Sequence, residues 1–341
     1  MNIKEALAAD DLLLVPQFSE IRTRQEVDIS AYLGKQMFPI PIISSPMDTV
    51  TETQMAGAIG ECGGLGIIHR YNTIQKQIEL VKNIKDMDIT PHGAAIGVTG
   101  DYLERAQELH KNGVKILCVD VAHGHHILMK EALTNLIKKM PSNVHLMAGN
   151  VATLEGYEAL CEWGANSVRI SVGSGSICST RLVSGHGYPL MQSLLNCKNS
   201  RFAGKVPMIA DGGIRNSGDI VKALAAGADF VMLGSLLAGT DESPGEIFLD
   251  NSGKKRKLYR GMASSSAQMD WRGKVGSKEG ISSSVVYQGT LLEVLTDLSW
   301  GIKSGLSYSG ARNIKELQQK AMFVKQTNAG QIESSTHILS R

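Results

Sequence analysis

The 341-residue sequence has few of the features that mark membrane, secreted or nucleic-acid-binding proteins. No apolar run approaches the roughly 18 residues of a membrane-spanning helix, so we expect no membrane partner. The amino terminus has no basic start followed by a long apolar stretch, so we expect no signal peptide. Aromatic residues make up only 5% and the formal net charge is +2. This composition gives no argument for a nucleic-acid partner.

Cysteine is also scarce. The five cysteines are odd in number and no pair has C-x-x-C spacing, which disfavours disulfides and a cysteine metal site. We therefore expect a cytoplasmic, reducing location. Four cysteines lie in or beside apolar stretches and are interpreted as core residues, whereas Cys178 lies in a loop rich in glycine and serine. Three histidines, His123, His125 and His126, have no cysteine or carboxylate at ligand spacing, so we assign them no metal role.

Short apolar runs recur along the chain and are separated by helix-like segments. The helical candidates include residues 101–113 and 217–228. The strand-like runs are residues 39–45, 65–70, 93–99, 115–122, 144–150, 166–172, 206–213 and 229–235. Eight such units predict a single-domain (β/α)₈ TIM barrel of the α/β class over residues 1–341. A doubly wound open sheet is the alternative, but no G-x-G-x-x-G follows an early strand.

A barrel places its active site after the strands, where polar and glycine-rich clusters occur. "SGS" (174–176), "DGG" (211–213) and "GS" (234–235) follow the last three runs. Loops at this position often bind phosphate through backbone N–H groups, although glycines also serve simple turns. Asp211 could accept both hydroxyls of a ribose or could cap a helix.

Cys178 is the candidate nucleophile, because a thiol beside backbone donors or a helix start can attack an electron-poor ring carbon. Thr180, two residues on, could orient a water or an amine in the same loop. The alternative for a lone cysteine in such a loop is a residue without chemistry.

A family resemblance rests on motifs that span nearly the whole chain. They are "SSPMDTVTE", "GGLGIIHR", "DVAHGH", "AGNVAT", "GSGSICSTR", "IADGGI", "VMLGSLLAGTDESPGE", "YRGM" and "EG" at 279–280. In content and order they resemble the IMP dehydrogenase/GMP reductase family. The resemblance implies a (β/α)₈ barrel, usually a homotetramer, that acts on a purine nucleoside monophosphate. It also implies a cysteine that bonds to C2 of the purine and a nicotinamide cofactor that exchanges hydride there.

By position, the resemblance implies roles for particular residues. Cys178 would be the nucleophile, and Thr180 and Glu279 would activate water or handle ammonia. The implied substrate ligands are Ser176, Gly213, Gly234, Ser235 and Tyr259 for the phosphate, Asp211 for the ribose, and Gly261, Met262, Ser45 and Met47 for the purine, which Glu279 would also contact. Asp120 would meet the nicotinamide ribose. In dehydrogenases K⁺ binds the cysteine loop and a neighbour's C-terminal segment, which here implies Gly173, Gly175, Cys178, Glu333, Ser334 and Ser335.

Two departures bear on the branch of the family. The chain runs directly from the second strand to the third, with no inserted CBS regulatory pair. Residues 263–285 form a flap-like excursion that we expect to be mobile, with 16 residues between Met262 and Glu279 and no Arg-Tyr pair. Dehydrogenases of the family carry a long flap with that pair, whose arginine serves as the base for hydrolysis.

The short excursion favours GMP reductase with NADPH, which needs no hydrolysis. IMP dehydrogenase with NAD and K⁺ is the alternative, because "GGLGIIHR", "EGI" and "ESSTH" look more like that branch. A nucleotide-binding barrel without catalysis is a third hypothesis, which the intact Cys178, Thr180, Asp211 and Glu279 disfavour.

Overall fold

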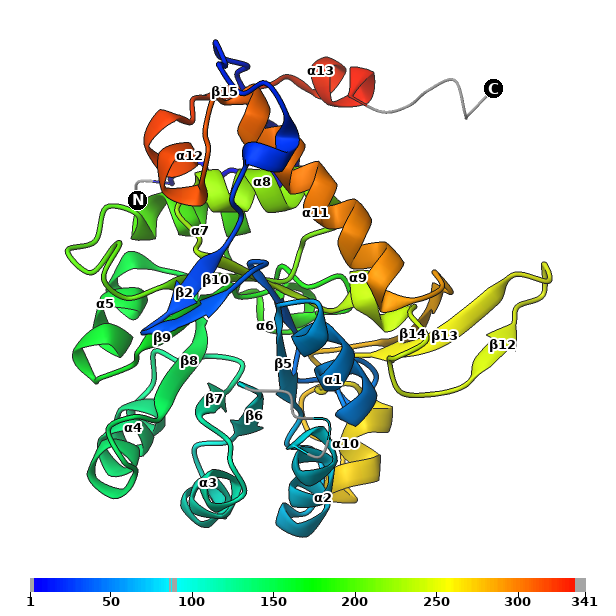
Figure 1. The fold of residues 1–341 in the computed structure, drawn as a ribbon. Helices are drawn as coiled ribbons and strands as arrows, with labels where there is room; N and C mark the ends of the chain where they lie inside the picture. Colours follow the sequence, from blue (N-terminus) through cyan, green and yellow to red (C-terminus); the bar gives the residue numbers. More distant parts are fainter. Residues whose placement is uncertain (1–2, 86, 88–90, 335–341) are drawn as a thin grey trace.

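Eight parallel strands form a closed barrel in the computed structural model, which describes residues 3–85, 87 and 91–334 (Figure 1). The hydrogen-bonded order is β10-β11-β4-β5-β6-β7-β8-β9. The bounds are β4 Ile42–Ser44, β5 Leu65–Ile68, β6 Gly93–Ile96, β7 Ile116–Asp120, β8 His145–Val151, β9 Ser167–Ile170, β10 Met208–Asp211 and β11 Phe230–Leu233. Seven of them lie inside predicted runs, β8 extends one residue beyond the run 144–150, and the predicted fold class is confirmed.

The barrel strands are buried on both faces, which is why they read as continuous apolar runs. β5 is entirely buried, because its side chains fill the barrel interior or contact the surrounding helices. The packing is close enough to require glycine within the strand. A Cβ on Gly66 would lie 2.5 Å from the Cα of Ala56 on helix α1.

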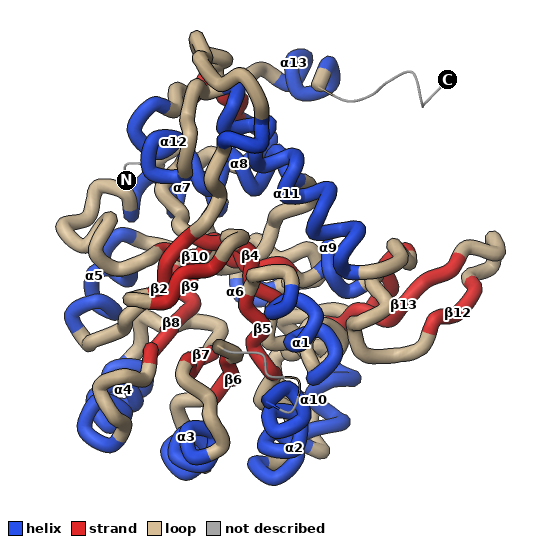
Figure 2. The backbone as a smooth tube through the Cα atoms, in the orientation of Figure 1, coloured by secondary structure: helices blue, strands red, loops and turns tan. Residues whose placement is uncertain are grey.

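Helices surround the strands, with helix and strand segregated into outer and inner layers (Figure 2). They are α1 Thr53–Glu61, α2 Ile74–Lys85, α3 Tyr102–Lys111, α4 Ile127–Lys139, α5 Leu154–Glu162, α7 Leu190–Cys197, α8 Ser217–Ala225 and α11 Leu291–Tyr308. Side-chain caps start several of them: the Thr153 hydroxyl accepts from the Gly156 N–H, and the Asn216 side chain accepts from the Asp219 N–H. The helices predicted at 101–113 and 217–228 are thus present with slightly narrower bounds.

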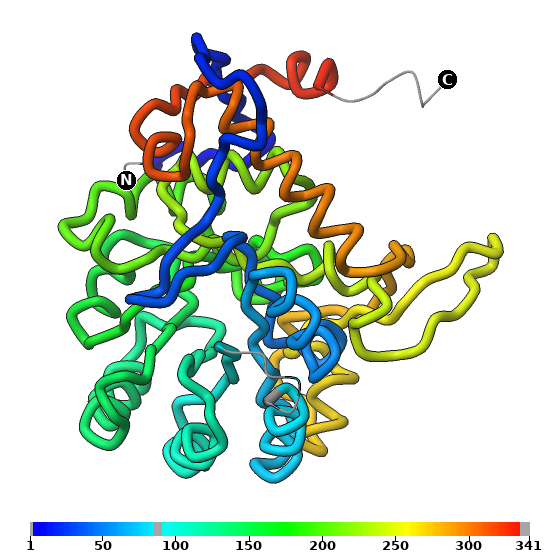
Figure 3. The backbone as a smooth tube through the Cα atoms, in the orientation of Figure 1, coloured from blue at the N-terminus to red at the C-terminus, as the bar shows by residue number. Residues whose placement is uncertain are grey.

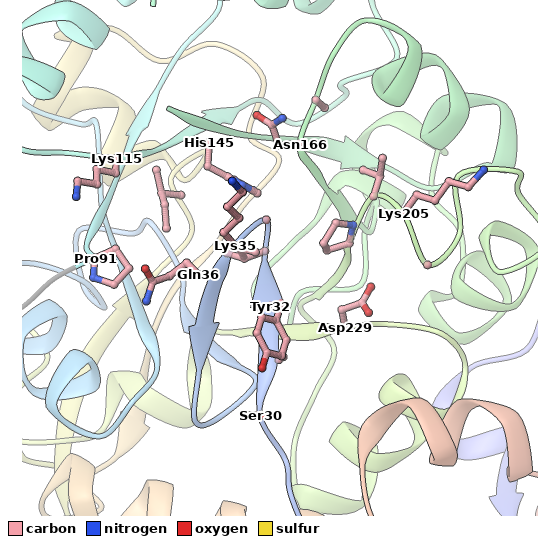
Figure 4. A pocket seen from close by; sticks show the side chains of 18 of the residues that line it. Ser30, Tyr32, Lys35, Gln36, Pro91, Lys115, His145, Asn166, Lys205 and Asp229 are labelled. Atoms are coloured by element: carbon pink, nitrogen blue, oxygen red, sulfur yellow. The ribbon is translucent and has the colours of Figure 1, made fainter. Parts of the chain in front are cut away.

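A hairpin covers the amino-terminal end of the barrel. It consists of β2 Ala31–Leu33 and β3 Gln36–Phe38, and it borders a hollow of about 1160 Å³ at the starts of the barrel strands (Figure 4). His145, at the start of β8, lies in this hollow and contacts the Ser167 hydroxyl at 2.8 Å. Burial lowers the pKa of His145 to about 4.

The two ends of the chain pair with each other. β1 Leu12–Leu14 is antiparallel to β15 Phe323–Lys325, so the earliest and latest segments run side by side (Figure 3). Short helices flank this pair: η1 Ala9–Asp11, η2 Arg24–Glu26, α12 Ile314–Lys320 and α13 Asn328–Glu333. An ion pair between Glu5 and Lys325 adds to the contact.

The region after the last barrel strand contains a small sheet that the sequence does not predict. Residues 236–341 exceed what eight β/α units need, and their sequence predicts a terminal helix at "LLEVLTDLSWGIKSGL" plus loops. Helix α11 confirms the predicted helix. The expectation of loops is wrong, because β12 Ile247–Leu249, β13 Lys255–Arg260 and β14 Ser282–Val286 form an antiparallel sheet that projects from the barrel (Figure 1). Within residues 263–285 lies helix α10, Ser265–Arg272, while the mobility of this excursion stays a prediction. None of the helices in the described ranges combines the length and apolar character that crossing a bilayer requires.

Candidate active site

A cavity of about 270 Å³ opens at the carboxyl ends of the barrel strands. It brings together nearly all of the residues singled out in the sequence, from segments more than 200 positions apart. Those lining it are Ser45, Met47, Asp120, Gly173, Gly175, Ser176, Cys178, Thr180, Asp211, Gly213, Gly234, Ser235, Tyr259, Gly261, Met262 and Glu279. The structure thus places these residues in one site, while their individual roles stay predictions.

The cysteine loop presents its thiol next to a hydroxyl. The Cys178 Sγ lies 3.1 Å from the Thr180 Oγ1, within hydrogen-bonding distance. The Cys178 N–H donates to the Gly175 carbonyl at 3.0 Å, which closes the loop into a turn before the short helix α6, Thr180–Ser184. The loop therefore holds the two side chains as a pair at the cavity wall.

The segment that carries Glu279 is hydrogen-bonded to the cysteine loop. The Ser179 N–H donates to the Glu279 carbonyl at 3.1 Å, and the Ile281 N–H donates to the Ile177 carbonyl at 3.0 Å. The Glu279 carboxylate accepts from the Ser277 hydroxyl at 2.9 Å. These bonds fix a carboxylate, a threonine and a thiol in one region, although about a hundred residues of chain separate them.

A second wall of the cavity is formed by two glycine turns, at Gly213 and Gly234, and by the hydroxyl of Tyr259. Gly213 has φ of +74°, and a Cβ there would lie 3.0 Å from the Ser174 carbonyl oxygen, so the turn requires glycine. A Cβ on Gly234 would lie 2.6 Å from the Tyr259 hydroxyl oxygen. That hydroxyl contacts the Ser176 side chain and the Ser235 backbone, and burial raises the pKa of Tyr259 to about 12. The tyrosine therefore stays a neutral donor at physiological pH.

Two partly buried carboxylates lie on either side of a buried arginine. Arg169, on β9, donates through Nη1 to Asp120 Oδ1 and through Nη2 to Asp211 Oδ2, each at 2.7 Å. Asn150 donates to the same Asp211 Oδ2 at 2.7 Å. Burial opposes ionisation of Asp120, but the charges of Arg169 and Arg70 prevail and hold its pKa below the ordinary value. Both carboxylates are thus positioned as hydrogen-bond acceptors.

Sequence reasoning missed Arg169, Asn150, Arg70 and Tyr71, all of which line the cavity. A signal for Arg169 was available. An arginine inside the apolar run 166–172 must lie buried in a parallel barrel, and a buried guanidinium needs carboxylate partners. Asn150 lies near the end of β8 and the Arg70–Tyr71 pair follows β5, but neither has a comparable sequence feature that would have marked it as a site residue.

An aromatic contact attaches α10 to the barrel beside Asp120. The rings of Trp271 and Tyr71 meet edge to face with centroids 5.1 Å apart, and the Arg70 guanidinium lies 4.9 Å from the Tyr71 ring. The Arg70 Nε lies 3.4 Å from Asp120 Oδ2. The excursion therefore approaches the Asp120 side of the cavity. Arg70 and Tyr71 line the cavity, whereas Trp271 does not.

Gln268 closes the excursion on itself. Its amide donates to the carbonyls of Ala263 and Ser277, and its oxygen accepts from the Gly276 N–H, all at 2.8 Å. Arg260 ties the excursion to the barrel by pairing with Asp48 and, at 2.6 Å, with Asp270 of α10. The segment between Met262 and Glu279 is thus a compact, internally bonded loop.

The predicted K⁺ residues are not brought together within one chain. Gly173, Gly175 and Cys178 line the cavity, whereas Glu333 and Ser334 lie at the end of α13 and do not. Ser335 lies outside the described residues. Because this ligand set was expected to combine two copies, a single chain leaves it a prediction.

Comparisons with known proteins agree on one family. The family described as IMP dehydrogenase/GMP reductase domain matches residues 6–337. Inosine-5′-monophosphate dehydrogenase of Borreliella burgdorferi is 38% identical, covering 98% of this chain and 97% of that protein. GMP reductase of Leishmania major is 30% identical, covering 100% and 98%. A cysteine-to-alanine variant of Trypanosoma brucei GMP reductase, crystallised with guanosine 5′-monophosphate, has a TM-score of 0.92 at 30% identity, covering 98% of both chains.

The fold is a closed barrel with a cysteine-bearing loop and two carboxylates at the carboxyl end of its strands, and the family match makes the chain an oxidoreductase. The chain belongs to the IMP dehydrogenase/GMP reductase family. Enzymes of this family use a nicotinamide cofactor. The relatives divide between dehydrogenases and reductases, so the family assignment leaves the direction of the reaction to be argued from the site.

Proposed function

We propose that this protein is a GMP reductase, converting GMP and NADPH to IMP, NADP⁺ and ammonia. The observation that carries the proposal is the short excursion closed by Gln268. It holds 16 residues between Met262 and Glu279 and has no Arg-Tyr pair. Hydrolysis of a covalent intermediate without a positioned base would lose about 10²–10⁴ in rate. Reduction of the intermediate needs no such base.

The cavity walls suit a purine monophosphate. Asp211 uses Oδ2 for three donor contacts from Arg169 and Asn150, and its Oδ1 accepts no hydrogen bond from the residues that the structure describes. That oxygen suits ribose hydroxyls. The Tyr259 hydroxyl, the Ser176 side chain and the glycine turns suit the phosphate. The related T. brucei protein was crystallised with GMP, which supports the same substrate class here.

In the proposed mechanism the Cys178 sulfur adds to C2 of GMP and the 2-amino group leaves as ammonia. Thr180, 3.1 Å from the sulfur, and the carboxylate of Glu279 handle the protons of these steps. Asp120, with Arg70 and Tyr71 beside it, would hold a nicotinamide cofactor that would supply the hydride for C2. The C–S bond then breaks, the electron pair returns to sulfur, and IMP is released.

The residues around Asp120 fit a nicotinamide cofactor. Asp120 lines the same cavity as Cys178 and lies against Arg70 and Tyr71, so a cofactor ribose bound there would adjoin the purine. Arg272, Lys274 and the serines at 265 and 266, all exposed, are proposed to contact a cofactor phosphate, which is why we propose NADPH over NAD. Ser264, expected to act with them, is instead 1% exposed and caps helix α10.

IMP dehydrogenase, with NAD, K⁺ and water, is the second candidate. The sequence identities favour it, at 34% and 38% for dehydrogenases of Nitrosopumilus maritimus and B. burgdorferi against 30% for the L. major reductase. Extra segments in the relatives do not discriminate, because alignments to a dehydrogenase and a reductase run over 473 and 484 positions, both longer than this chain.

A homotetramer in a reducing cytoplasm completes the proposal, and five free cysteines support that compartment. The decisive assay follows absorbance at 340 nm with GMP plus NADPH and, separately, with IMP plus NAD⁺, each with and without K⁺. We expect a decrease in the first pairing only. A rise in the second pairing alone, larger with K⁺, would instead establish the dehydrogenase. Turnover in neither, despite nucleotide binding, would favour a binding protein.

A further inference from the structure

We propose that Arg169 is a positioning residue that couples the nucleotide-binding carboxylate Asp211 to the cofactor-binding carboxylate Asp120. The inference rests on the proposed function, because it takes Asp211 and Asp120 as the two ribose acceptors. It goes beyond that function by predicting that a change on the cofactor side alters nucleotide affinity through a single guanidinium group.

The geometry makes Arg169 a bridge between the two carboxylates. Its Nη1 reaches Asp120 Oδ1, and its Nη2 and Nε reach Asp211 Oδ2 at 2.7 and 3.2 Å. The side chain is 7% exposed, and the two carboxylates are 14% and 13% exposed. No other arginine or lysine among the described residues forms an ion pair with Asp211.

The guanidinium is suited to this position and an ammonium is not. Its planar fork fixes the directions of its N–H groups. One group extending from β9 can therefore serve a carboxylate on the adjacent strand β10 and another on β7, two strands away on the other side. A lysine at 169 would carry the same charge but could not reproduce both sets of contacts. The carboxylates are also crowded enough that removing the cation leaves two like charges poorly compensated.

The contact to Asp120 restrains Arg169 from taking both oxygens of Asp211. Replacing Asp120 by asparagine leaves Nη1 only neutral acceptors, the amide oxygen and the Cys118 sulfur at 3.3 Å, so the fork can turn toward the charged Asp211 and occupy its Oδ1 as well. That oxygen is the one left for the ribose of the nucleotide. Weakening the Asp120 end should therefore weaken GMP binding, even though Asp120 does not itself contact GMP in the proposed arrangement.

A double-mutant cycle tests the bridge. The dissociation constant of GMP, with no cofactor present, is measured by calorimetry for wild type, Asp120→Asn, Arg169→Met and Asp120→Asn/Arg169→Met. We expect Asp120→Asn to raise that constant about three- to tenfold in the wild-type background and to have no effect beside Arg169→Met. If Arg169→Met does not fold by circular dichroism, the same cycle with Arg169→Lys decides, with the Asp120→Asn effect reduced to less than half.

Arg105→Lys is the matched control for loss of a buried arginine. Arg105 is 5% exposed, pairs with Asp101 at 2.7 Å at the start of its own helix α3, donates to Gln77 of α2 at 2.8 Å, and does not line the cavity. Arg169→Lys should raise KM for both GMP and NADPH, whereas Arg105→Lys should lower the melting temperature without changing either KM. A purely structural arginine at 169 would behave as Arg105 does.

The possible outcomes separate this inference from the proposed function. An Asp120→Asn effect of equal size in both backgrounds, or no effect in either, overturns the coupling while leaving the enzyme assignment intact. Failure of the wild-type protein to bind GMP overturns the proposed function and the coupling with it. If Asp120→Asn weakens GMP binding only when Arg169 is present, the coupling through Arg169 is supported. That conclusion holds for either direction of hydride transfer in the spectrophotometric assay.

Discussion

Replacing Tyr259 by phenylalanine tests the phosphate wall with little change in shape. The side chain is 5% exposed, and its hydroxyl contacts the Ser176 side chain and the Ser235 backbone. The hydroxyl lies so close to Gly234 that a Cβ at that position would clash with it. Phenylalanine keeps the ring packing and deletes one donor. A hydrogen bond to a charged group contributes about 1.5–3 kcal/mol, which corresponds to about a 10- to 150-fold change in affinity.

The assay compares GMP with guanosine, which lacks the phosphate. In Tyr259→Phe we expect the dissociation constant of GMP to rise by that factor while the constant for guanosine is unchanged, and the KM for GMP to rise more than kcat falls. The melting temperature should fall by no more than a few degrees, since only the two neutral contacts of the hydroxyl with Ser176 and Ser235 are lost. Equal weakening of GMP and guanosine would show that the hydroxyl supports the fold of the cavity and does not contact phosphate.

Three further changes have defined outcomes. Cys178→Ala should abolish turnover in either direction while GMP still binds in calorimetry; residual turnover would contradict covalent catalysis. Gln268→Ala removes three hydrogen bonds of about 1 kcal/mol each, so residues 263–279 should become more susceptible to limited proteolysis while the barrel resists it; unchanged cleavage would show that other contacts close the excursion. Burial lowers the pKa of His145 to about 4, against about 6.5 in the unfolded chain. As pH falls from 6.5 to 4 the unfolded chain therefore binds the proton first, and the free energy of unfolding should fall by about 3 kcal/mol. Denaturant melts across this range should show a smaller loss for His145→Gln, and an equal loss in both proteins would assign the acid sensitivity elsewhere.

The barrel could be predicted because its strands are buried on both faces and its loops are short. Runs such as Leu65–Ile68 are apolar throughout, so they are recognised as buried strands without any alternation of polar and apolar residues. Capping residues such as Asn216 mark the starts of the helices. The hairpin Ala31–Phe38 and the strand Ser282–Val286 were missed for the opposite reason. The hairpin strands have three residues each and are only half buried, the strand Ser282–Val286 is mostly serine and exposed, and the pairing of both depends on partners that local sequence does not reveal.

Site residues could be predicted where they belong to a sequence motif. They could not be predicted where their role depends on contacts with residues distant in the sequence. Cys178 and Asp211 stand out because glycines surround them, and glycine clusters mark close approach of the backbone. Asn150 has no such context, and its importance arises only from a 2.7 Å contact with Asp211 across two strands. Trp271 is similar, since its partner Tyr71 is distant in the sequence.

Lys257 shows how a basic stretch that looks solvated can position a site residue. It is 2% exposed although it belongs to the run "KKRK", and its ammonium group donates to the carbonyls of Thr240 at 2.9 Å and Ser243 at 2.6 Å. Because side chains alternate along a strand, Lys257 and Tyr259 lie on the same face of β13. The lysine therefore anchors that face to the turn after helix α9, Ser235–Ala238, which begins at the wall that Tyr259 contacts. The position of the Tyr259 hydroxyl thus depends on a buried ammonium group two residues away, and not only on the glycine turns of the barrel.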